Sequence, residues 1–213
     1  MPTAPEPDVR GLRIGIVEQL VEAAEPYVSD GIGAMARELE ALGAELVPLR
    51  LELLHHTTAL HLIVQHAEAA RVHAPWFQSQ RDRYAEPVRR RLEAGRLIPA
   101  SAYLAAQQAR RLVVEEVARA MAGLDAMLAP STPLVAPARD AVEVTVRGAP
   151  LPLRVALLMC TLPISQLGSP AVSVPIGSHA GLPYGMQIVG RPSSEALLLR
   201  IAAACEPVPS PLA

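Results

Sequence analysis

Leu12-Arg-Ile-Gly-Ile-Val17 and Leu46-Val-Pro-Leu49 are short runs of apolar and β-branched residues, and both predict β-strands. Between them we expect a helix that begins at a cap on Ser29 or Asp30 and ends at Gly43. Its apolar residues recur at helical spacing, at Ile32, Met35, Leu39 and Leu42. A strand, a helix and a strand this close in sequence favour a parallel strand pair with a right-handed crossover.

The rest of the chain continues this alternation. Residues 57–122 are rich in alanine, leucine and arginine and predict helices, interrupted at Pro75, Pro87, Gly95 and Pro99. Residues 130–175 are rich in proline and predict loops and short elements. Further strands are predicted at Leu124–Ala129, Ala171–Ile176 and Tyr184–Val189, the last two joined by a turn through Gly177 and Gly181, and a closing helix begins at Pro192 and Ser193. The fold class is therefore α/β.

Composition excludes several classes of protein. The 213 residues are 51% apolar and carry a net charge of −2, which suits a chain with a buried core and gives no positive field for nucleic acid. The longest apolar stretch, Val155–Ile164, is too short to cross a membrane. The N-terminus does not resemble a secretory signal. Cys160 and Cys205 lack metal-type or redox-type spacing, so we expect a cytoplasmic protein.

The basic residues are unusual, because all 19 are arginine and the chain contains no lysine. Mechanisms that need a lysine base, a Schiff base or a phosphate-binding lysine are therefore closed to this chain acting alone. The chain also lacks asparagine, which indicates a compositional bias along the whole sequence.

Four further patterns favour structure over chemistry. Gly31, Gly33 and Ala36 match a dinucleotide fingerprint, but the motif does not directly follow a strand, so a glycine-containing helix N-terminus is the better interpretation. Five histidines between residues 55 and 73 lack the three- or four-residue spacing of helical metal ligands. Cys160 lies in an apolar run and is interpreted as a core residue. The arginines of Arg81–Arg96 alternate with acids, which predicts a solvated helical face. We predict no cofactor and no metal.

Three residues remain as candidates for binding a substrate. Arg110 lies in an alanine-rich helix, where a guanidinium must be paired or must face a cleft. Ser131 and Thr132 follow a predicted strand, at the end where ligands gather in open α/β sheets. The alternative for these two residues is a capped turn between Pro130 and Pro133.

Four stretches occur in an ordered set that covers residues 11–206: Gly11–Val17, Ala41–Val47, Tyr103–Arg110, and a block with Thr161-Leu-Pro163, Gly168-Ser-Pro-Ala-Val-Ser-Val-Pro175 and Gly185-Met-Gln-Ile-Val-Gly190. Together they resemble the C-terminal half of the amidase signature family, which includes amidases and the A-type chain of glutamyl-tRNA amidotransferase. The resemblance implies a mixed sheet flanked by helices and an amidase-like domain over residues 11–206. The flanking residues 1–10 and 207–213 are predicted to be flexible.

The resemblance also implies a chemistry that this chain cannot complete. The family activates a nucleophilic serine with a second serine, in a cis peptide, and a lysine, and all three belong to its N-terminal half; no catalytic residue is carried over. Arg110 matches the arginine that contacts the carboxylate of the amide donor in the amidotransferase. The aspartate that contacts the donor's amino group would fall near Leu158. An apolar or differently charged small amide therefore fits better than glutamine.

Two hypotheses follow. The first is the C-terminal portion of an amide C–N bond hydrolase, which forms the sheet core and one wall of the substrate pocket and is inactive alone. Its partner would be a chain carrying the N-terminal catalytic half, or a second copy of itself, since half a sheet exposes an unpaired edge. The alternative is a non-catalytic binding or scaffold protein, or a truncated remnant of an amidase.

Overall fold

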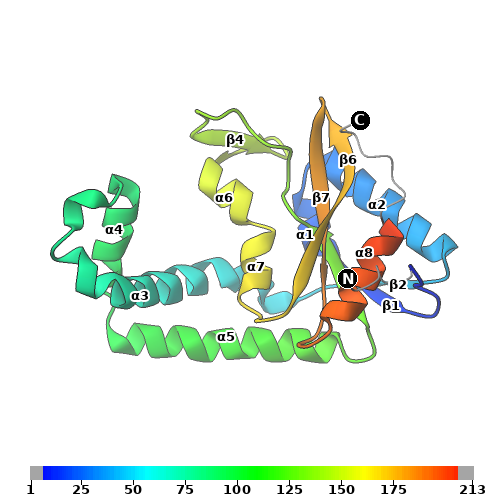
Figure 1. Cartoon of the computed structure of the whole chain (residues 1–213). Coiled ribbons are helices and arrows are strands. Elements are labelled where there is room, and N and C mark those ends of the chain that lie inside the picture. Colours follow the sequence, from blue (N-terminus) through cyan, green and yellow to red (C-terminus); the bar gives the residue numbers. More distant parts are fainter. Residues whose placement is uncertain (1–6, 206–213) are drawn as a thin grey trace, which may run out of the picture. The chain divides into compact units, whose positions relative to one another are not determined.

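The structure is a computed structural model that describes residues 7–205, and these fall into two compact units (Figure 1). Unit 1 comprises the chain up to Glu52 and from Val117 onward, and unit 2 is Leu53–Glu116. The tail predicted at 207–213 lies outside the described residues, as does most of the segment predicted at 1–10. Val9, which lies in the segment predicted to be flexible at 1–10, is buried in the core of unit 1. The proposed domain boundaries remain a prediction.

Unit 1 contains a five-stranded sheet in the order β2-β1-β3-β7-β6. Its strands are β1 (Arg13–Val17), β2 (Glu45–Leu49), β3 (Ala126–Pro130), β6 (Ala171–His179) and β7 (Leu182–Val189). β1 runs parallel to both β2 and β3, whereas β7 is antiparallel to β3 and to β6. The predicted parallel pair and the mixed sheet of an α/β fold are both confirmed.

One face of this sheet is covered by α2 (Pro26–Ala41) and α8 (Glu195–Cys205), which Figure 1 shows on the same side of β6 and β7. Side chains alternate between the faces of a strand, so each strand contributes every second residue to this core. The largest buried side chains of this face come from both helices and the sheet: Ile14, Ile32, Met35, Leu39, Leu128, Met186, Ile188 and Ile201. Burying these apolar groups is the main stabilising contribution to unit 1.

The proline-rich segment between β3 and β6 forms short elements, as expected. These are the hairpin of β4 (Glu143–Val146) and β5 (Ala149–Pro152), followed by α6 (Leu153–Leu158) and α7 (Thr161–Ser165). Arg147, in the hairpin turn, donates from Nη2 to Ser29 Oγ (3.0 Å) and from its backbone N–H to Glu25 Oε1 (2.6 Å). The hairpin is therefore tied to the start of α2.

The start predicted for the helix between β1 and β2, at a cap on Ser29 or Asp30, was wrong. α2 begins at Pro26, after a further short helix α1 (Glu18–Ala23), and its N-cap residue Glu25 makes no capping bond through its side chain. Ser29 instead donates its hydroxyl proton to Val21 O at 2.7 Å, which fastens α2 to α1. Gly43, with φ +98°, does end the helix as predicted, because glycine tolerates this conformation.

Unit 2 is helical throughout. It contains η1 (Glu52–His56), α3 (Thr57–Phe77), η2 (Arg81–Arg83), α4 (Glu86–Gly95) and α5 (Ala100–Ala120), the last of which continues into unit 1. Pro75 lies inside α3 rather than interrupting it, two residues before its end. α3 and α4 approach closely at Gly95, where a Cβ would lie 2.0 Å from the carbonyl oxygen of His66. Within residues 7–205, no helix has both the length and the apolarity needed to cross a bilayer.

Gly31 of α2 and Gly177 of β6 make room for Tyr184. A Cβ at Gly31 would lie 2.6 Å from the Tyr184 hydroxyl oxygen, and one at Gly177 would lie 2.4 Å from the same atom. The Tyr184 ring therefore fits between α2 and β6 only because both positions lack a side chain. Gly31 lies in the interior of α2, which agrees with the rejection of a dinucleotide site.

This packing predicts opposite effects for two glycine substitutions in the same helix. Gly31→Ala should lower the free energy of unfolding by about 1–3 kcal/mol, because the new methyl group overlaps Tyr184. Gly33→Ala is the matched control: its Cβ would lie 3.6 Å from its nearest neighbour, the flexible Arg37 side chain. It should raise stability by about 0.5–1 kcal/mol through helix propensity. Urea unfolding measures both, and effects of the same sign would contradict the account.

Candidate functional site

Ser131 lies directly after β3, in unit 1, where the sequence predicted a ligand-binding position. Its backbone N–H donates to Gly185 O at 2.9 Å, and its Oγ lies 2.6 Å from Ser173 Oγ on β6. Ser173, 42 residues away, is a site residue that the sequence analysis missed. The strand register could have found it, because Ala129, Gln187 and Ser173 are cross-strand partners.

The two serine hydroxyls form a small hydrogen-bonding centre. One proton is shared between the oxygens, so the other remains available to donate to a third group. Gly185 lies beneath them; a Cβ there would be 3.4 Å from both hydroxyl oxygens and 2.9 Å from Val174 O. A hydroxyl becomes a nucleophile when a base accepts its proton, and a second hydroxyl is a poor base. The pair can therefore bind a carbonyl or carboxylate oxygen but is not activated for attack.

Thr132 takes part in the turn that follows. Its Oγ1 donates to Leu134 O, two residues on, at 2.8 Å, as in the capped turn that was the alternative interpretation. Farther along this loop, Val135 N donates to the hydroxyl oxygen of Tyr27 at 3.0 Å. Since the Thr132 proton is used within the turn, this hydroxyl has only acceptor capacity left for a ligand.

Gln187 supports the site from β7. Its side chain is 5% exposed, and Nε2 donates both to Pro130 O (2.8 Å) and to Cys160 O (2.9 Å). These two bonds connect the end of β3 with the segment that leads into α7. Burial raises the pKa of the Cys160 thiol to about 12, so it stays protonated at neutral pH. The interpretation of Cys160 as a core residue is confirmed.

Arg110 belongs to unit 2. It lies half-buried on α5, a helix whose Tyr103 hydroxyl donates to Glu68 Oε1 (2.8 Å) and accepts from Gln107 Nε2 (2.8 Å). The two serines, Ser131 and Ser173, belong to unit 1. The role of Arg110, Ser131 and Thr132 in binding a substrate remains a prediction.

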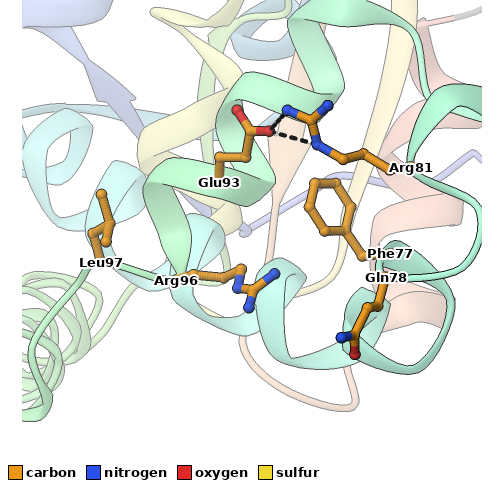
Figure 2. Close-up of a pocket in the computed structure, with 6 residues that line it drawn as sticks. All are labelled: Phe77, Gln78, Arg81, Glu93, Arg96 and Leu97. Atoms are coloured by element: carbon orange, nitrogen blue, oxygen red, sulfur yellow. Dashed lines mark hydrogen bonds and ion pairs between the residues drawn. The ribbon is translucent and has the colours of Figure 1, made fainter.

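Unit 2 also contains a shallow pocket of about 460 Å³, drawn in Figure 2. The Arg96 guanidinium lies over the Phe77 ring, 5.9 Å from its centroid. Arg81 Nε donates to Glu93 Oε1 at 3.0 Å, and a second bond joins Arg81 Nη2 to the same oxygen. The pocket is lined by Phe77, Gln78, Arg81, Glu93, Arg96 and Leu97. Its one carboxylate is held by Arg81, so the pocket offers an aromatic wall and a cation but no free base.

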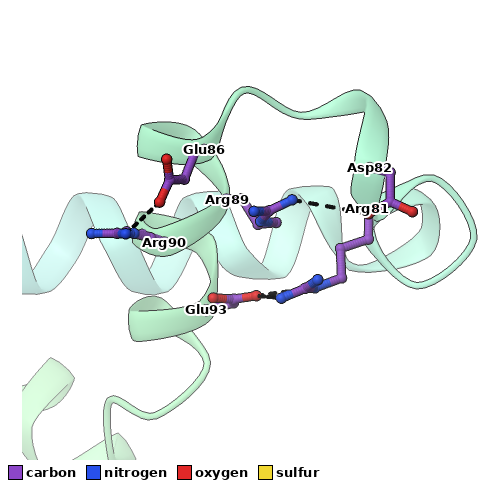
Figure 3. Close-up of polar contacts among 6 residues, drawn as sticks. All are labelled: Arg81, Asp82, Glu86, Arg89, Arg90 and Glu93. Carbon is purple, nitrogen blue, oxygen red and sulfur yellow. Dashed lines mark hydrogen bonds and ion pairs between the residues drawn. The ribbon is translucent and has the colours of Figure 1, made fainter.

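Three of the arginines around this pocket, Arg81, Arg89 and Arg90, are paired with acids, as the sequence predicted. Figure 3 shows Arg90 paired with Glu86 and Arg89 3.9 Å from Asp82, beside the Arg81–Glu93 pair. Most of these side chains are strongly exposed, and exposed pairs of this kind contribute about 0–1 kcal/mol each. The prediction of a solvated helical face is confirmed.

The histidines make local contacts. His55 and His56 have ring centroids 3.8 Å apart, and His73 Nδ1 lies 3.1 Å from the Tyr84 hydroxyl oxygen. Among residues 7–205, no group of three or more histidine, cysteine or acidic side chains is arranged to hold a metal ion.

Comparison with known proteins decides the family. A family model described as Amidase matches residues 3–199, which is most of the chain. The chain belongs to the amidase family. Among curated members of that family, the chain is 36% identical to the A-type chain of glutamyl-tRNA(Gln) amidotransferase from Myxococcus xanthus and 34% identical to that from Chloroflexus aurantiacus. These matches cover 94% and 93% of this chain but 46% and 45% of the relatives.

A solved amidase structure shows the same fold, with a TM-score of 0.86 and 27% identity over 94% of this chain and 46% of the other. A chain of a second solved structure, described as a vestigial protein complex that reveals the evolutionary origins of an s-triazine catabolic enzyme, has a TM-score of 0.82 and 28% identity over 92% of this chain and 43% of the other. The chain thus spans about half the length of its amidase relatives and matches the C-terminal half of amidase-signature proteins. The fold class and the family inferred from the sequence are confirmed.

The double hydrogen bond of Gln187 yields a prediction about the site's stability. Gln187→Met keeps the side-chain volume but removes two hydrogen bonds to buried carbonyl oxygens, so the free energy of unfolding should fall by about 1–3 kcal/mol. The control is Gln108→Met on the exposed side of α5, which should change stability by about 0.5 kcal/mol at most. Chemical denaturation measures both variants, and a neutral Gln187→Met would contradict this role.

Proposed function

We propose that this chain is the C-terminal portion of a hydrolase that cleaves amide C–N bonds, and that it is inactive alone. The observation that carries the proposal is a family match over about 46% of the relatives' length in a sequence without lysine. A serine nucleophile needs a base, and the paired hydroxyls of Ser131 and Ser173 provide none. The chain would supply sheet core and one wall of the substrate pocket to a partner that carries the catalytic residues.

The proposed pocket wall favours one kind of substrate. By the family resemblance, Arg110 would bind a carboxylate of the substrate. By the same resemblance, the aspartate that contacts the donor's amino group would fall near Leu158, and an apolar side chain cannot pair with an ammonium. The substrate would therefore be a small amide with a carboxylate but no amino group, such as glutaramate.

The partner would be a chain with the N-terminal half of an amidase, and the compartment would be the cytoplasm. Both cysteines are free and buried, and burial also raises the pKa of the Cys205 thiol to about 12. Free thiols that have no disulfide role are compatible with a reducing compartment.

The alternative proposal is a non-catalytic binding or scaffold protein descended from an amidase. It is supported by the continuous core of unit 1, which buries large side chains from α2, α8 and the sheet. A scaffold of this kind would be a monodisperse monomer that melts cooperatively without a partner.

Amide hydrolysis distinguishes these proposals. The purified chain should release no ammonia from glutaramate, propionamide or glutamine above a buffer control. A chimaera that joins it to the N-terminal half of the Myxococcus xanthus relative should hydrolyse at least one of them, and replacing the chimaera's nucleophilic serine by alanine should abolish turnover. Turnover by the chain alone would overturn the proposal, and a well-folded but inactive chimaera would favour the scaffold.

The role of Arg110 is tested in the same chimaera. Arg110→Ala should raise KM for glutaramate roughly 10- to 100-fold, the effect of losing one charged hydrogen bond, and leave KM for propionamide unchanged. The control is Arg111→Ala, since Arg111 is exposed and pairs with Glu115 on the same helix at 2.9 Å. Equal effects of the two substitutions, or equal effects on the two amides, would assign Arg110 a structural role.

A further inference from the structure

Arg96, the last arginine of the run Arg81–Arg96, departs from the pairing seen along this part of unit 2. Arg81, Arg89 and Arg90 each have an acidic partner (Figure 3). Within residues 7–205, no carboxylate pairs with the Arg96 guanidinium. Its positive charge is therefore not offset in the part of the chain that the structure describes.

The position of Arg96 distinguishes it from an ordinary surface cation. Its guanidinium lies over the Phe77 ring, 5.9 Å from the ring centroid, at the wall of the pocket in unit 2 (Figure 2). A guanidinium is planar, and an aromatic ring beneath it favours one orientation of that plane. Among the described residues, its N–H groups find no hydrogen-bond acceptor, so they remain available to a ligand.

Contacts within unit 2 hold this aromatic wall in place. Phe77 is only 4% exposed, and its ring centroid lies 5.6 Å from that of Tyr84. The Tyr84 hydroxyl oxygen lies 3.1 Å from His73 Nδ1, which fixes the second ring against α3. α3 and α4 also pack closely at Gly95, directly before Arg96. Both sides of the pocket are thus formed before a ligand binds, which lowers the entropic cost of binding.

The charges of the pocket favour a ligand with one negative charge. Glu93, the only carboxylate that lines the pocket, accepts both hydrogen bonds from Arg81, so these two charges offset each other. The net positive charge of the lining residues is that of Arg96. A carboxylate matches it well, because its two oxygens fit the parallel N–H donors of a guanidinium.

The remaining surface of the pocket favours a flat apolar group beside that carboxylate. Leu97 lines the pocket and is 83% exposed, so a ligand that covers it removes apolar surface from water. The face of the guanidinium that is turned away from Phe77 can stack on a second aromatic ring. The volume of about 460 Å³ lies within the range of small-molecule sites in proteins.

We propose that this pocket, at the C-terminal ends of α3 and α4, binds a small aromatic monocarboxylate. The carboxylate pairs with Arg96, and the ring stacks on the guanidinium and covers Leu97. The proposal goes beyond the proposed function, because it concerns unit 2 alone and requires neither amide hydrolysis nor a partner chain.

Calorimetric titration of the full chain with benzoate tests the proposal. Benzoate should bind with a Kd of about 0.1–1 mM, as expected for a small ligand with one charged contact. Benzyl alcohol keeps the ring without the charge, and acetate keeps the charge without the ring, so each should bind roughly tenfold more weakly or worse. Absence of benzoate binding would overturn the proposal, and so would equal affinity for inorganic phosphate, which would indicate a general anion site.

Substitutions of Arg96 provide a second test. Arg96→Ala should weaken benzoate binding roughly tenfold or more, because it removes the charged hydrogen bonds. Arg96→Lys keeps the charge but loses the planar donors, so its affinity should lie between the two. The matched control is Arg90→Ala on the same helix, since Arg90 is exposed and pairs with Glu86. Equal benzoate affinity of Arg96→Ala and Arg90→Ala would overturn the proposal.

A change of the opposite sign separates binding from a structural role of Arg96. Glu93→Gln removes the pocket's carboxylate and frees Arg81, so benzoate should bind roughly three- to tenfold more tightly. If Arg96 only stabilises the C-terminal end of α4, Arg96→Ala would lower the Tm while Glu93→Gln left benzoate binding unchanged, and that result would overturn the proposal. None of these titrations measures hydrolysis, so their outcome is independent of the proposed function.

Discussion

The structure of unit 1 depends on the position of β3 in the sheet. All five residues of Ala126–Pro130 are buried, and the strand pairs in parallel with β1 and antiparallel with β7. β3 therefore joins the parallel pair of β1 and β2, near the start of the chain, to the antiparallel pair of β6 and β7, near its end. Strands more than a hundred residues apart in sequence are thereby brought into one sheet. The hydroxyl pair of Ser131 and Ser173 exists because this register sets the end of β3 and the middle of β6 on either side of β7, where Gly185 has no side chain to separate them.

Much of the fold could be predicted because strands in this chain are short apolar runs between clear breakers. Leu12–Val17 and Leu124–Ala129 agree with β1 and β3 within two residues at either end. The start of α2 could not be predicted, because Ser29 is a favourable cap in isolation and only the tertiary position of α1 draws its hydroxyl to Val21 O. Ser173 was missed for a related reason, since its partner is set by strand register and not by local sequence.

The reactive side chains of the described residues are engaged in contacts within the chain. The hydroxyls of Ser131 and Ser173 bond to each other, and burial keeps the Cys160 thiol protonated. The carboxylate of Glu93, in the pocket of unit 2, is paired with Arg81. The absence of lysine from the chain gains meaning from the family assignment. The resemblance implies that amidases of this type use a lysine from the other half of the fold as part of their catalytic machinery.

The central claim is that this chain is one half of a single folded unit, and calorimetry of the two halves together tests it most directly. An equimolar mixture with the N-terminal half of the Myxococcus xanthus relative should unfold in one transition, at a Tm above that of either half and rising with concentration, because association stabilises only the folded chains. Two separate transitions at the temperatures of the isolated halves would contradict the claim.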